Sequence, residues 1–237
     1  MSTFGESIHT ASGLLLQADP VLLGTIGLSL RVSGSACLLA ALIGMLGGAW
    51  LAVSRFPGHR ALLATLNTML ALPSVVVGLV VYLLLSRSGP LGAWGILYTP
   101  SAMVIAQTIL LLPIVAALTR QIVADGLREG GPPLRSMGAG PLTSALLMLV
   151  HERWAVLTIM LTAFGRAISE IGAVIIVGGN IEGFTRVITT SIALETSKGD
   201  LALALALGLV LLALVGAINV AIMLAQRVQL PLAPGNR

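Results

Sequence analysis

Residues 155–177 read AVLTIMLTAFGRAISEIGAVIIV, an apolar run long enough to cross a membrane as a helix. Two charges interrupt this run, because Arg166 and Glu170 stand one helical turn apart near its middle. A charged side chain at the centre of a bilayer costs about 2.5–3.5 kcal/mol, so such residues usually face a protein interior or a watery path. The pair therefore predicts either a transport pathway or a mutual structural ion pair, for which the order Arg before Glu is the less favourable one.

The composition places the whole chain in the membrane class. Hydrophobic residues make up 57% of the sequence and charged residues 9%, whereas about a quarter of a soluble domain is charged. Apolar runs near the length of a spanning helix occur at 32–53, 61–85, 102–118, 155–177 and 201–225, and the third is the shortest. No segment alternates apolar and polar residues as outer-membrane strands do. We therefore expect a single all-α membrane domain, 1–237, with about five transmembrane helices.

The positions of Lys and Arg predict the orientation of these helices. With an external N-terminus, one side of the membrane receives only Arg87, Arg186 and Lys198. The other side receives Arg55, Arg60, Arg120, Arg128, Arg135, Arg153, Arg227 and Arg237. The positive-inside rule makes the richer side cytoplasmic, which puts the N-terminus outside and the C-terminus inside. Residues 1–20 then form an external segment that lacks the charged start of a signal peptide, and 178–200 form an external loop.

The longest cytoplasmic connection, 120–153, is rich in Gly and Pro and too polar to be a further span. Connections of more than about 15 residues are usually functional or disordered. We therefore expect a short helix in it, bounded by these helix breakers, that contacts a cytoplasmic partner; a plain connector is the alternative. Pro73 and Pro113 predict kinks in the second and third spans, which serve either as gates or as passive bends.

The sequence around the charged pair carries several long motifs. These are GRAISEIGA at 165–173, VGGNI at 177–181 and TRVITTSIALETSKGD at 185–200, with weaker likeness in RFPG at 55–58 and LPSVVVG at 72–78. In these motifs the chain resembles the permease subunits of type I ABC importers for oxyanions, specifically the tungstate-type branch. The resemblance implies a homodimer in the cell inner membrane that works with a cytoplasmic ABC ATPase dimer and an external or periplasmic oxyanion-binding protein.

The resemblance also implies that the cytoplasmic loop couples the chain to its ATPase. The loop signature of the family is Glu-Ala-Ala, three further residues and then Gly. Gly138 and Ala139 match its glycine end, whereas the Glu-Ala-Ala positions hold Pro132, Pro133 and Leu134. This chain has no P-loop, because its only lysine, at position 198, stands in Ser-Lys-Gly. We therefore expect ATP to be bound by the partner and no cofactor to be bound by this chain.

For a tetrahedral dianion, a pathway needs weak and transient stabilisation, because the ligand must leave again. Arg166 supplies charge and several donors, Glu170 neutralises or orders it, and Ser169 and Asn180 add neutral donors. Hydroxyls at Thr185, Thr189, Thr190 and Ser191 are expected to be solvated or to cap helices. The segment 188–194 is too short to span a membrane and predicts a short external or re-entrant helix.

We therefore expect a permease that imports tungstate, with molybdate or another tetrahedral oxyanion as the alternative. A membrane-embedded enzyme is a weaker hypothesis, because His9, His59 and His151 lack metal-ligand spacing and no catalytic or metal site is predicted. The hypothesis of a passive channel does not explain the long cytoplasmic loop. Nucleic acid is not an expected partner, because basic and aromatic residues do not interleave. Membrane lipid is an expected partner.

Overall fold

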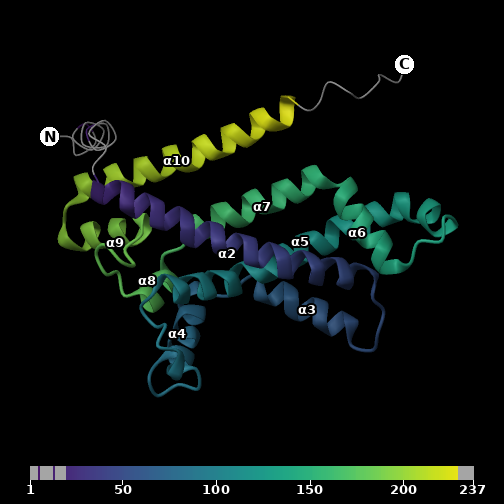
Figure 1. Ribbon diagram of the computed structural model, residues 1–237, viewed down its shortest axis with the longest axis horizontal. Coiled ribbons are helices and arrows are strands. Elements are labelled where there is room, and N and C mark those ends of the chain that lie inside the picture. The colour runs from purple at the N-terminus through teal and green to yellow at the C-terminus, as the bar shows by residue number, and fades with distance from the viewer. Residues whose placement is uncertain (1–4, 6–12, 14–19, 229–237) are drawn as a thin grey trace. The chain divides into compact units, whose positions relative to one another are not determined.

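The computed structural model describes the chain at residues 5, 13 and 20–228, and every regular element in that part is helical (Figure 1). The chain divides into two compact units, Gly24–Thr190 and a second formed by Met1–Leu23 with Ser191–Arg237. The external segment predicted at 1–20 lies almost entirely outside the described residues, as does Arg237. The all-α class predicted from composition is confirmed.

The larger unit holds most of the helices. They are α2 (Pro20–Val53), α3 (His59–Met69), α4 (Ser74–Leu85), the 3-10 helix η1 (Gly92–Trp94), α5 (Pro100–Ser136), α6 (Pro141–His151), α7 (Arg153–Ile168) and α8 (Gly172–Gly178). Two further helices follow, α9 (Ile188–Lys198) and α10 (Leu201–Val228). The helix expected at 188–194 is therefore present as α9.

The core of the larger unit is built around α5. Its residues enter three buried clusters, which join it to α2, α4 and α8, then to α2 and α7, and finally to α2 and α6. The second cluster is dominated by small side chains at helix contacts, namely Ala36, Cys37, Ala40, Ala163 and Ala167. Small residues let helix backbones approach closely, which is how helices associate in lipid, where burial of apolar surface gives no driving force.

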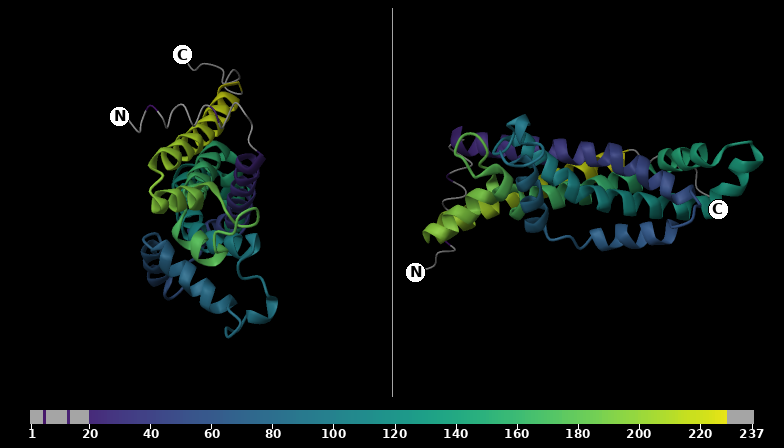
Figure 2. Two further views of the ribbon diagram at one scale, coloured as in Figure 1. Left: turned by 90° about the vertical axis from the view of Figure 1, so that its left-hand side faces the viewer. Right: turned by 90° about the horizontal axis from the view of Figure 1, so that it is seen from below.

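Helices α2 and α5 lie side by side (Figure 2), and two glycines of α2 allow their close approach. A Cβ on Gly48 would lie 2.5 Å from the backbone oxygen of Ala116 and 2.8 Å from the Cβ of Thr119. A Cβ on Gly44 would lie 3.0 Å from the Cβ of Val115. Gly47, the third small residue of this stretch, has nothing within 4 Å of its Cβ position. Gly44 and Gly48 therefore form the contact, as their small-xxx-small spacing predicts.

Three helices are long and apolar enough to cross a membrane alone: α2, α5 and α10. The count of five spans is reached only if each bent pair, α3 with α4 and α6 with α7, forms one span. Helices α3 and α4 meet at 101°, so the second predicted span is not one kinked helix. Pro73 stands at the N-cap of α4, where its missing N–H costs no helical hydrogen bond.

The third and fourth predicted spans need correction. The third predicted span is not short, because α5 continues to Ser136 through Pro113, Pro132 and Pro133 and so contains the first half of the predicted 120–153 loop. The helix expected within this loop is α6, which meets α7 at 78°. The fourth span is broken, because α7 ends at Ile168 and α8 begins at Gly172.

The turn between α5 and α6 is a Schellman motif. Gly138 has a positive φ of 81°, its N–H donates to the carbonyl of Arg135, and the N–H of Ala139 donates to the carbonyl of Leu134. This pattern satisfies the last free carbonyls of a helix and requires a left-handed residue, usually glycine, just beyond its end. Gly138 is thus needed for its backbone conformation, since no atom lies within 4 Å of its Cβ position.

Gly48→Ala is expected to lower the unfolding free energy by about 1–3 kcal/mol, because the added methyl meets backbone atoms of α5 that cannot move aside independently. Gly47→Ala is the matched control on the adjacent residue and is expected to leave stability unchanged or slightly raised. Thermal unfolding of the purified chain in detergent measures both. Equal melting temperatures for the two variants would contradict this packing of α2 on α5.

Candidate functional site

The charged pair lies at a helix break and not within a helix. Arg166 stands in the last turn of α7, and Glu170 lies in the three-residue interruption before α8 begins at Gly172. A cation near a helix C-terminus and an anion near a helix N-terminus are both stabilised by the helix dipole. The order Arg before Glu, unfavourable inside one continuous helix, is favourable across two helix ends.

Glu170 is the centre of a buried polar network. Its side chain is 4% exposed, one carboxylate oxygen accepts a hydrogen bond from Arg166 and the other accepts from the N–H of Ala173 at 3.3 Å. The hydroxyl of Ser74, at the start of α4, also hydrogen-bonds to Glu170. The backbone carbonyl of Glu170 accepts from the hydroxyl of Thr189 at 2.9 Å. The carboxylate therefore ties α7, α8 and α4 together.

Gln107, on α5, completes this network and was not identified from the sequence. Its side-chain N–H donates to the carbonyl of Ala167 at 3.0 Å, beside the break. Its side-chain oxygen is buried and has no hydrogen-bond partner in the described part of the chain. The available signal was an amide within the third apolar run, because polar groups in spanning segments commonly bond to neighbouring helices.

Arg166 remains partly accessible despite its ion pair with Glu170. Its side chain is 41% exposed and lies with Gln107, Leu110 and Leu111 of α5 at a surface cleft that is too shallow to enclose a water molecule. A guanidinium has five N–H donors, and the structure assigns one of them to Glu170. The remaining donors can meet an anion at this cleft, while the carboxylate limits the net charge.

Ser169 lies beside the pair but faces its own helix. Its hydroxyl is positioned to donate to the carbonyl of Gly165 at 2.9 Å or to that of Arg166 at 3.2 Å. These carbonyls belong to the last turn of α7, where the backbone carbonyls have no N–H donor within the helix. Ser169 is exposed and acts locally as a cap, although its oxygen can still accept a hydrogen bond.

Asn180 is separated from the charged pair, because the two stand at opposite ends of α8. It follows Gly179 with a positive φ of 50°, and its side-chain nitrogen donates to the carbonyl of Thr190 at 3.5 Å. Its side-chain oxygen is buried without a hydrogen-bond partner in the described residues. The structure therefore brings Arg166, Ser169 and Glu170 together and places Asn180 in the next loop.

The threonines predicted as caps do cap backbone groups. Thr185 donates to the carbonyl of Gly178 at 2.5 Å and accepts from the N–H of Ile181 at 3.0 Å. Thr190 accepts from the N–H of Val187 at 3.0 Å at the start of α9. These bonds hold the loop after α8 in one conformation. Among the described residues, no three His, Cys, Asp or Glu side chains gather to hold a metal ion.

Glu170→Ala is expected to lower the unfolding free energy by about 2–3 kcal/mol, because it leaves the Ala173 N–H and the Ser74 hydroxyl without their acceptor. Glu170→Gln keeps an acceptor of the same shape and is expected to lose less than half as much. Thermal unfolding of the two purified variants in detergent compares them. Equal losses would show that charge alone, and not hydrogen bonding, holds the break.

Comparison with known proteins identifies the family. No family model matches the chain. The tungstate uptake system permease protein TupB of Peptoclostridium acidaminophilum is 44% identical over 94% of this chain and 97% of its own length. TupB of Campylobacter jejuni is 38% identical over 90% of each chain. A probable anion ABC transporter permease protein of Haloferax volcanii is 41% identical over 81% of this chain and 84% of its own. The chain belongs to the family of oxyanion ABC transporter permeases that includes TupB, and it is a multi-pass protein of the cell membrane.

Proposed function

We propose that the chain is the membrane-spanning subunit of an ABC transporter that imports tungstate. The observation that carries this proposal is the 44% identity to a tungstate uptake permease along almost the whole chain. The likeness covers both the charged break after α7 and the turn after α5, so it extends to both ends of the larger unit. Molybdate or another tetrahedral oxyanion is the second candidate, favoured by the relative that is named only as an anion permease.

The cleft beside Arg166 is the proposed point of contact with the oxyanion. The exposed part of the guanidinium offers donors in the fork geometry that suits oxyanions. Glu170, bonded to the same guanidinium, prevents the cation from holding a dianion too tightly for release. Ser169 lies at the same break, and Asn180 marks the next loop as a second contact along the pathway.

The positions of the arginines predict how the chain is oriented in the membrane. The C-terminal ends of α2 and α5 and the N-terminal ends of α3 and α7 all lie toward one end of the larger unit (Figure 1). These ends carry Arg55, Arg60, Arg128, Arg135 and Arg153. By the positive-inside rule this end faces the cytoplasm, so residues 1–20 and 178–200 are external and the C-terminus is cytoplasmic.

The proposed assembly is a homodimer with two ATPase subunits and an external oxyanion-binding protein. The segment 120–153 is the coupling loop, with the end of α5 and all of α6 as its structured part. Met137 is 82% exposed and Val150 is 70% exposed on this segment. These exposed apolar side chains are the proposed points of contact with the ATPase. Because the chain has no P-loop, the ATPase supplies all nucleotide chemistry.

Arg166→Ala is expected to reduce tungstate uptake at least tenfold without reducing the amount of protein in the membrane, because the partly exposed guanidinium is the cation at the cleft. Arg87→Ala is the matched control, since Arg87 is exposed in the loop after α4 and belongs neither to this cleft nor to the segment 120–153. The tungsten and molybdenum contents of cells supplied separately with each oxyanion measure uptake. Unchanged uptake by the Arg166 variant would remove this residue from the pathway.

Gly138→Leu is expected to leave membrane insertion intact and to uncouple ATP hydrolysis from uptake, because a branched side chain is strained at a φ of 81°. Gly138→Asn is the control, since asparagine tolerates the left-handed conformation and should retain most of the coupling. ATPase activity and tungstate uptake of the reconstituted transporter give the ratio. Normal coupling in the Leu variant would exclude this turn from the contact with the ATPase.

A further inference from the structure

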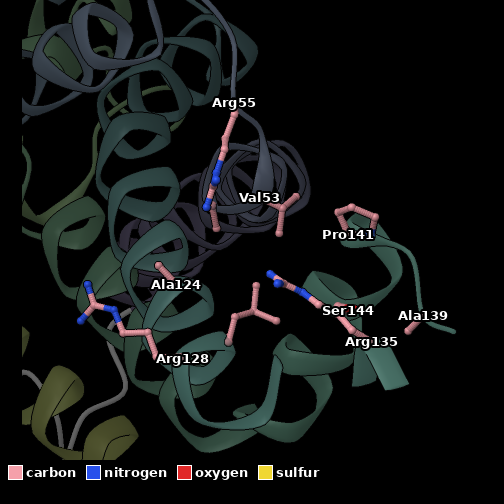
Figure 3. Close-up of a pocket in the computed structure, with 10 residues that line it drawn as sticks. Val53, Arg55, Ala124, Arg128, Arg135, Ala139, Pro141 and Ser144 are labelled. Carbon is pink, nitrogen blue, oxygen red and sulfur yellow. The ribbon is translucent and has the colours of Figure 1, made fainter. Parts of the chain in front are cut away.

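A cavity of about 540 Å³ lies between the C-terminal end of α2, the last turns of α5 and the start of α6 (Figure 3). It belongs wholly to the larger unit and lies far along α5 from the Arg166 cleft. Its lining contains no acidic residue and three arginines, Arg55, Arg128 and Arg135. Its volume is in the range of small-molecule sites, which is about 300–1,000 Å³.

Two of the three arginines face the cavity. Figure 3 shows the side chains of Arg55 and Arg135 directed into the space and that of Arg128 directed away from it. Arg128 is paired with Asp125, with 3.2 Å between the guanidinium nitrogen and the carboxylate oxygen. Among the described residues, neither Arg55 nor Arg135 forms an ion pair. Two uncompensated guanidinium groups thus converge on one cavity.

A buried hydroxyl and a helix end add further donors. Ser144 lines the cavity and is 4% exposed, and its hydroxyl oxygen is buried without a hydrogen-bond partner in the described part of the chain. Buried polar atoms are nearly always bonded, and this oxygen is out of reach of solvent in the conformation shown, so a rotation about the Cα–Cβ bond that turns it toward the cavity breaks no hydrogen bond. The N-terminus of α6 begins at the cavity with Pro141 and has no side-chain cap. Its positive dipole end favours an anion.

We propose that this cavity binds a tetrahedral oxyanion group of the phosphate class. Arg55 and Arg135 bind its oxygens through paired N–H donors, as guanidinium groups bind phosphate. Ser144 donates a hydrogen bond once its hydroxyl rotates toward the cavity, and the uncapped end of α6 adds to the positive potential. A concave site closed by three helices of one chain fits a small anionic group better than a protein surface.

Two sources can supply such a group. Ala52 and Val53, the last residues of the apolar helix α2, line the cavity, so it lies at the end of a helix that is long and apolar enough to span a bilayer. A phospholipid phosphate reaches this depth from the membrane. A free oxyanion, such as phosphate or tungstate, reaches it from the water. Both use the same donors, and the site is independent of the proposed transport pathway.

The test uses the full chain in nanodiscs made of phosphatidylcholine alone or with added phosphatidylglycerol. Titration of inorganic phosphate and of tungstate into the neutral nanodiscs measures a free oxyanion, and native mass spectrometry after gentle delipidation measures retained phosphatidylglycerol. The double variant Arg55→Gln, Arg135→Gln is expected to lower the affinity for the bound species at least tenfold, and Ser144→Ala is expected to lower it roughly fivefold. Arg128→Gln and Arg166→Ala are controls that should retain this binding. Thermal unfolding establishes that all variants are folded.

Binding of phosphate or tungstate in the neutral nanodiscs would identify the ligand of the cavity as a free oxyanion. Retention of phosphatidylglycerol alone would identify it as a lipid phosphate. Either result supports the site if the double variant loses the species and Arg128→Gln does not. Equal losses in those two variants would overturn the proposal, because general surface charge would then be sufficient. Absence of binding by all probes would also overturn it, and weakened ATPase association in the double variant would then assign the cavity to the ATPase.

Discussion

A helix that breaks inside an apolar run exposes backbone groups that lipid cannot satisfy, so the protein must satisfy them itself. Around the interruption at 169–171, it does so with side chains from several elements. Glu170 accepts the N–H of Ala173, Gln107 donates to the carbonyl of Ala167, and Thr189 donates to the carbonyl of Glu170. This arrangement fixes where α7 ends and α8 begins, and two of the three buried clusters include a residue beside it, Ala173 in one and Ala167 in the other.

One helix connects this break with the opposite end of the unit. Gln107 lies near the start of α5, and the Schellman turn at Gly138 ends it. At 1.5 Å per residue, these two points are about 46 Å apart along a single helical rod. Because α5 also enters all three buried clusters, one continuous element joins the packing at the break to the packing against α6. This gives the proposed coupling a physical route.

Sequence reasoning found the class of fold and the positions of the long helices, because apolar runs have to match the thickness of a bilayer. It missed the interruption at 169–171, since three residues within an apolar stretch barely alter its average hydropathy. It ended the third span at 118, because the segment from 120 onward is polar and contains several helix breakers, among them Pro132 and Pro133. They lie in the last turns of α5, where the carbonyls left without partners can be hydrated. Gln107 escaped notice because its role depends on α7, which is distant in sequence.

At the turn after α5, the match to the family signature has a local structural explanation. Gly138 is required by its left-handed conformation whatever the loop contacts, so its match to the signature is explained by the turn itself. The acidic start of the signature is absent, since Pro132 stands in its place. Met137 is instead the most exposed large apolar residue described, at 82%. The proposed contact of this loop with an ATPase therefore lacks the acidic residue of the signature and has the exposed side chain of Met137 beside the turn, while the guanidinium of Arg135 faces the cavity behind it.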